Sequence, residues 1–156
     1  MSPRTLAIGI ILVLGTACDP AFGIRVGQRI RPSPGCVDSA LHASSLVAHV
    51  APAAVRSGVQ AYEVVLNDPS FGPNRNRRVD VTRTDTGDTS ATTVAVTARW
   101  IGTARLPPDE ERLYVRSASQ LLGELRHACS PASDSALSCT YVLRRGSCRT
   151  FVSGPA

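Results

Sequence analysis

The sequence contains no lysine, since all 17 of its basic side chains are arginine. Arginine matches phosphate groups well, so an all-arginine set can indicate nucleic-acid binding. Here the absence of lysine extends over the whole chain, which a GC-rich genome explains more simply. Only the segment 74–78 is locally basic, and its place beside Phe71-Gly72-Pro73 indicates a solvated hairpin loop. We therefore expect no nucleic-acid partner.

Motifs that mark common enzymes and metal sites are also missing. The sequence has no Gly-x-Ser-x-Gly, His-Glu-x-x-His, Walker-type loop or Cys-x-x-Cys. Its histidines are His42, His49 and His127. The first two are seven residues apart on an expected helix, about 10 Å along its axis, too far to share one metal ion. We expect no catalytic residue, metal ligand or cofactor.

No apolar run is long enough to cross a bilayer. The longest, from Leu6 to Leu14, falls well short of the ~20 residues that a membrane helix needs. Arg4 precedes this run and the small residues Gly15, Thr16 and Ala17 follow it, which is the three-part pattern of an export signal. The pattern predicts a signal peptide at residues 1–17 and cleavage before Cys18.

The segment Leu14-Gly15-Thr16-Ala17-Cys18 resembles the lipobox of bacterial lipoproteins, with Gly15 where an aliphatic residue is commonest. The resemblance implies that Cys18 carries a diacylglycerol thioether, becomes the first residue, and is acylated on its amine in many bacteria. Two or three acyl chains make attachment to the extracytoplasmic side of the cell membrane effectively permanent. Asp19 favours the inner membrane in proteobacteria, so the choice between inner and outer membrane stays open. The alternative is an ordinary secreted protein that begins with cysteine.

The other four cysteines form an even set in an oxidising compartment, which predicts two disulfides. They are Cys36, Cys129, Cys139 and Cys148. Because three of them lie in the last third of the chain, Cys36 must reach one of these and the other two must pair locally. A left-handed Gly146 in a three-residue hairpin loop would place Cys139 and Cys148 on opposite faces. This geometry favours Cys129 with Cys139 and Cys36 with Cys148.

Hydrophobic periodicity predicts the secondary structure of the mature chain. A helix capped by Ser33 and running to about His49 is expected because apolar residues recur there at helical spacing. A second helix is expected from Pro107 to Cys129, with three acidic residues in its first turn. Alternating patterns predict strands at residues 22–31, 62–66, 79–84 and 93–100, and a final hairpin from residues 137–143 and 147–151.

The element order predicts an α+β fold, a two-layer sandwich with a largely antiparallel sheet and two helices on one face. Residues 18–33 would form the lipidated N-terminus and a first strand or arm, and residues 34–156 a single domain. The expected function is that of a small binding or scaffolding domain anchored in the cell envelope, with the membrane and an unidentified envelope protein as partners. Its binding surface would be a sheet face or a sheet edge. The alternative is an envelope enzyme whose site is assembled from scattered residues.

Overall fold

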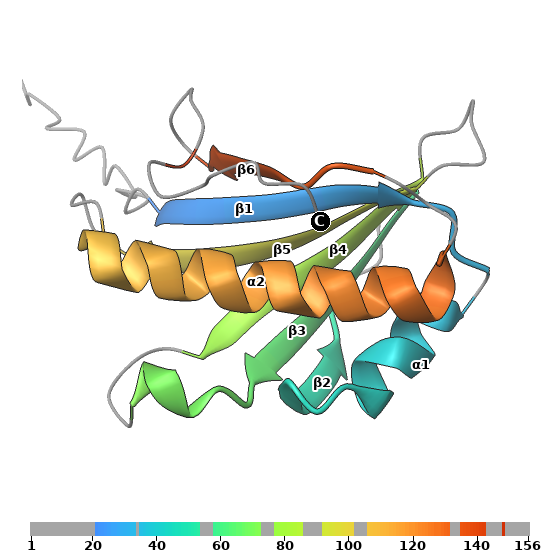
Figure 1. The fold of residues 1–156 in the computed structure, drawn as a ribbon, viewed down its shortest axis with the longest axis horizontal. Helices are drawn as coiled ribbons and strands as arrows, with labels where there is room; N and C mark the ends of the chain where they lie inside the picture. Colours follow the sequence, from blue (N-terminus) through green and yellow to red (C-terminus); the bar gives the residue numbers. More distant parts are fainter. Residues whose placement is uncertain are drawn as a thin grey trace, which may run out of the picture.

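The computed structural model describes residues 21–33, 35–53, 58–72, 77–85, 92–101, 106–131, 135–142 and Cys148. The expected signal peptide and Cys18 lie outside these residues. The elements are β1 (Ala21–Ile30), α1 (Cys36–Ala43), β2 (Val47–Pro52), β3 (Val59–Leu66), a 3-10 helix η1 (Pro69–Phe71), β4 (Arg78–Asp85), β5 (Thr92–Ile101), α2 (Pro108–Cys129) and β6 (Ser138–Tyr141) (Figure 1).

The six described strands form one antiparallel sheet in the order β2-β3-β4-β5-β1-β6. The chain-consecutive pairs β3–β4 and β4–β5 confirm the hairpins that the turn residues predict. β1 lies between β5 and β6 and pairs with β5 from Ala21 opposite Ile101 to Ile30 opposite Thr92. The first strand is therefore a central part of the sheet and no detached arm.

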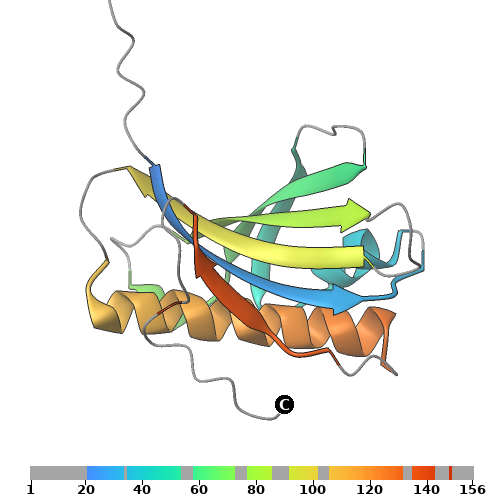
Figure 2. The same cartoon turned by 90° about the horizontal axis from the view of Figure 1, so that it is seen from above.

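Both helices pack on the same face of the sheet (Figure 2). The second expected helix is confirmed as α2, and it buries an apolar stripe in which Leu121, Leu122 and Leu125 are at most 1% exposed. α1 contributes Val37 and Leu41 to the same core. These side chains meet the inward residues of the strands, among them Ile24 and Val96. The fold is thus the α+β sandwich that the element order predicts.

The first helix begins later than the sequence predicts. Its N-cap is Gly35 and not Ser33, and the N–H of Ser39 donates to the carbonyl oxygen of Gly35 at 3.1 Å. Gly35 has a φ of 77°, a left-handed conformation that only glycine adopts without strain. Ser33 instead accepts the N–H of Cys36 through its carbonyl oxygen.

The same helix also ends earlier, at Ala43, and the expectation that it continues to His49 is wrong. The hydroxyl of Ser44 accepts the N–H of Leu46 at 3.2 Å, a local bond that competes with helical bonding. The next residues, Val47–Pro52, form β2 and pair with β3. Pairing in the sheet therefore overrides a helical spacing that was present in the sequence.

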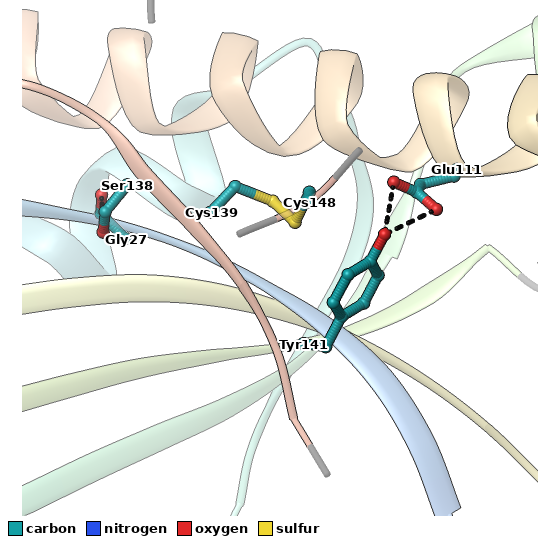
Figure 3. Close-up of a disulfide and its surroundings, with 6 residues drawn as sticks. All are labelled: Gly27, Glu111, Ser138, Cys139, Tyr141 and Cys148. Carbon is teal, nitrogen blue, oxygen red and sulfur yellow. Dashed lines mark hydrogen bonds between the residues drawn. A yellow bond between two sulfur atoms is a disulfide. The ribbon is translucent and has the colours of Figure 1, made fainter. Parts of the chain in front are cut away.

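The four remaining cysteines form two disulfides, but in another pairing than the one favoured above. Cys36 pairs with Cys129, and Cys139 pairs with Cys148. The N–H of Cys148 donates to the carbonyl oxygen of Cys139, so these two residues lie side by side and not on opposite faces. Figure 3 shows this disulfide beneath α2. The first disulfide joins the start of α1 to the end of α2.

The first strand of the final hairpin is confirmed as β6. Of the second strand, expected at residues 147–151, only Cys148 belongs to the described residues. The basic segment 74–78 is described only at Arg77 and Arg78. Arg77 donates a guanidinium N–H to the carbonyl oxygen of Gly72 at 3.1 Å, and Arg78 begins β4.

Candidate functional site

One face of the sheet is covered by no described helix or strand. The strand residues that belong to the core, such as Val81 and Val96, point toward α2. Because strand side chains alternate between the two faces, their sequence neighbours point the other way. Figure 2 shows α2 on one side of the sheet and no helix on the other. We name this second side the outer face.

A row of small side chains crosses the middle of the outer face. Ala61 of β3 lies opposite Thr82 of β4, and Thr82 lies opposite Ala95 of β5. Ala95 also lies opposite Gly27 of β1, which in turn pairs with Ser138 of β6. No side chain in this row is larger than threonine. The row therefore forms a strip across five neighbouring strands, and Ala95 at its centre is 0% exposed.

Charged side chains stand beside this row. Arg78 Nη1 lies 3.1 Å from Glu63 Oε1, and Arg99 Nε lies 3.4 Å from Asp80 Oδ2. These four side chains are 37% to 70% exposed, so each ion pair contributes little to stability. Exchange of these two ion pairs for contacts with the charges of a binding partner would therefore cost little free energy. The four side chains line an open hollow of about 160 Å³ together with Val79 and Thr97.

The edges of the sheet are less suited to binding than its outer face. β2 carries Pro52, which has no N–H to donate, and its register with β3 shifts between Val47 and His49. β6 has only four residues, and the carbonyl oxygen of Cys139 already accepts the N–H of Cys148. Proline, register irregularities and short strands are features that prevent the addition of a further strand.

A second polar cluster surrounds Asp68, whose side chain is 15% exposed. Its carboxylate accepts the N–H of Ser70 and the hydroxyl of Ser117, both at 2.8 Å. Burial alone would raise the pKa of Asp68, but the hydrogen bonds from Ser117 and Ser70, together with the charge of Arg116, lower it below its ordinary value. Asp68 therefore caps η1 and ties it to α2.

An open hollow of about 270 Å³ adjoins this cluster, lined by Leu46, Asn67, Asp68, Pro69, Arg116 and Gln120. Arg116 also donates to the hydroxyl of Ser70 at 3.1 Å. Asp68 and Arg116 both hold η1 against α2, and this structural role accounts for their arrangement.

The third polar feature is a buried carboxylate in the first turn of α2. Glu111 is 1% exposed, and the hydroxyl of Tyr141 lies 3.0 and 3.2 Å from its two oxygens (Figure 3). The N-terminus of a helix favours negative charge, which lowers the cost of this burial. Tyr62 on β3 is also buried. Burial is the main cause that raises the pKa of its hydroxyl, the negative charge of Asp38 raises this pKa further, and the positive charge of Arg83 lowers it.

The histidines are distributed differently from the expectation. His42 is on α1 but His49 is on β2, so the two do not share a helix. His42 Nδ1 lies 2.9 Å from the carbonyl oxygen of Asp38 one turn earlier. Within the described ranges, no group of three or more histidine, cysteine or acidic side chains has the geometry to hold a metal ion.

Sequence reasoning missed two of these polar residues. Glu111 was explained as one of three acids at a helix start, although it precedes Tyr114 and Ala118 at spacings of three and seven residues. Those spacings place it on the apolar stripe of α2 and predict its burial. The order Asp68-Pro69-Ser70 is the sequence signal for the capping of η1 by Asp68.

Comparisons with known proteins do not assign this chain to a family. Neither a protein-family model nor a curated protein matches the sequence. In the part of the chain that the structure describes, neither helix is both long and apolar enough to cross a bilayer. The class that the geometry defines is an α+β sandwich with one sheet face turned away from its helices.

Proposed function

We propose that this chain is a lipid-anchored protein of the bacterial cell envelope whose domain binds a partner through its outer face. The lipid would be carried by Cys18, and the partner would be another envelope protein. Two disulfides among the described residues support an oxidising compartment. The pairing of Cys36, Cys129, Cys139 and Cys148 also leaves Cys18 as the odd cysteine, as lipid attachment requires.

The observation that carries the binding role is the row of small residues across the outer face. The row from Ala61 to Ser138 crosses five strands, and because Ala95 at its centre is 0% exposed, a second protein surface would contact the exposed side chains on either side of the row. The flanking pairs of Arg78 with Glu63 and Arg99 with Asp80 supply polar contacts of both signs at its rim. The charged groups of the hollow beside Asp68 already hold η1 against α2, so we assign the function to the outer face.

The anchor is tested by the intact mass of the protein extracted from membranes of a lipoprotein-processing bacterium. The wild-type chain is expected to have the mass of residues 18–156 plus a diacylglyceryl group, with or without a further acyl group. A Cys18→Ser variant is expected to lose both the modification and the membrane attachment, because serine has no sulfur for the thioether. An unmodified wild-type chain that begins at Cys18 would contradict the anchor.

The binding face is tested by photo-crosslinking in the same cells. A photoreactive amino acid is placed at Thr140 on the outer face or at Ala128 on α2, both of which are exposed positions. We expect a crosslinked partner of one defined size from position 140 and none from position 128. The result that contradicts the proposal is equal crosslinking from both positions or none from position 140, with lipidation of each variant verified by mass.

A further inference from the structure

We infer that the end of the domain at which β1 begins rests in the interfacial layer of the lipid bilayer, with Trp100 at the contact. This inference deepens the proposed function and rests on the lipid anchor at Cys18. It concerns the end of the sheet at which β1 begins, whereas the row from Ala61 to Ser138 crosses the middle of the sheet.

The first argument is the length of the tether. Only two residues, Asp19 and Pro20, separate Cys18 from Ala21, the first residue of β1. Consecutive Cα atoms are about 3.8 Å apart, so the Cα of Ala21 lies at most about 11 Å from that of Cys18. The polar layer on each side of a bilayer is about 5 to 8 Å thick. A lipid on Cys18 therefore holds the start of β1 at the membrane surface.

The strand cannot move away to lengthen this tether. β1 is paired with β5 along its whole length and with β6 from Gly27 to Ile24. The N–H of Val142 continues that pairing by donating to the carbonyl oxygen of Gly23 at 2.9 Å. Detaching the first residues of β1 would break hydrogen bonds on both of its sides. A short segment therefore links the lipid to the start of a strand that is hydrogen-bonded on both of its sides.

The second argument is the kind of side chain found at this end. Phe22 lies directly opposite Trp100 in the register of β1 and β5, and both are half-buried. Val142 lies at the same end of the sheet but on its outer face, and it is 39% exposed, the exposed large apolar side chain of the described part of the chain. It packs over Gly23, where a Cβ atom would lie 2.8 Å from Val142 Cγ2. Tryptophan and other amphipathic or apolar side chains are those that membrane interfaces favour.

The charges at this end have both signs. Arg99 is next to Trp100, and its side chain is 58% exposed. The first turn of α2 begins at the same end of the molecule and carries Asp109 and Glu110 (Figures 1 and 2). No strong attraction to anionic lipid is expected from such a mixture. The contact is therefore an apolar one with the interface, and it should form on zwitterionic lipid.

The test uses the fluorescence of Trp100, which is the single tryptophan of the sequence. The lipidated full-length mature protein is reconstituted into phosphatidylcholine vesicles, with and without phosphatidylcholine brominated on the acyl chain near the headgroup. We expect brominated lipid to cause a loss of Trp100 emission, and the vesicles to shift the emission to shorter wavelength relative to the Cys18→Ser protein in buffer. Quenching must be absent when that unlipidated protein is mixed with the same vesicles at low concentration.

A tryptophan at the opposite end of the domain provides the matched control. The variant Trp100→Phe with Arg31→Trp places it just after the last residue of β1, about 30 Å from Ala21 by the rise of a strand. Arg31 is exposed, and only its backbone N–H is bonded to Ser130, so the substitution leaves that bond in place. We expect no quenching of this residue by brominated lipid.

The possible outcomes distinguish the orientation of the domain at the membrane from the lipid anchor at Cys18 on which it rests. Quenching at position 100 without quenching at position 31 supports the orientation. A protein that carries the diacylglyceryl group but shows no quenching of Trp100, or equal quenching at both positions, overturns the orientation and leaves the anchor standing. A protein that lacks the lipid by mass overturns the anchor itself.

Discussion

Replacement of both Cys36 and Cys129 by alanine is expected to lower the free energy of unfolding by about 4 to 5 kcal/mol. The disulfide closes a loop with a sequence separation of 93 residues, and the entropy that a crosslink removes from the unfolded chain grows with loop length. It also joins the first turn of α1 to the last turn of α2, so its loss frees the shorter helix. Denaturant unfolding of the non-lipidated Cys18→Ser protein, followed by circular dichroism, measures this loss.

The double variant Cys139→Ala with Cys148→Ala is the matched comparison. It also removes two sulfur atoms, but its loop has a separation of only nine residues, for which about 2 to 3 kcal/mol is expected. The long-range disulfide should therefore be worth about 2 kcal/mol more than the local one. A larger loss from the local pair would show that packing of the buried Cys139 and Cys148 outweighs the chain entropy.

Leu121→Ala is expected to lower the free energy of unfolding by about 3 kcal/mol. Leu121 is 0% exposed and lies in the middle of the apolar stripe with which α2 covers the sheet. Truncation of a buried leucine costs the transfer free energy of its methyl groups plus that of the cavity left behind. The same denaturant unfolding experiment measures the change.

Val142→Ala serves as the control for this substitution. Its side chain is 39% exposed, so less apolar surface is lost, and we expect a cost below about 1 kcal/mol. If the two substitutions cost the same, α2 would not be held to the sheet by its apolar stripe in the way described.

The prediction of the fold succeeded where a pattern was carried by many residues. The alternation in β1 and β5 and the long stripe of α2 each extend over eight or more residues, so local periodicity and tertiary burial agree. The prediction failed at the end of the first expected helix, where Val47 fits the helical spacing but is also β-branched and begins β2. There the neighbouring strand β3 decided the structure, and no local signal reports such a neighbour.

The sequence predicts which types of residue lie on the outer face, but it does not predict which of them are neighbours across the strands. The alternation of β4 and β5 indicates a polar face rich in threonine and arginine. Only the register of five strands shows that Ala61, Thr82, Ala95, Gly27 and Ser138 form one row. Register depends on which strands are neighbours, and here β1 enters between β5 and β6 from a distant part of the chain.

By itself the sequence determined the fold class, the number of disulfides, and the expectation of a lipid on Cys18, because these depend on composition and on the local order of residues. Only the tertiary structure decided which cysteines pair, since pairing requires Cα atoms within reach, as at 5.7 Å for Cys36 and Cys129. It also decided that Glu111 is buried beneath Tyr141 and that one sheet face stays clear of the helices. Each of these outcomes joins residues far apart in the chain, and their distance in space is set only when the whole domain folds.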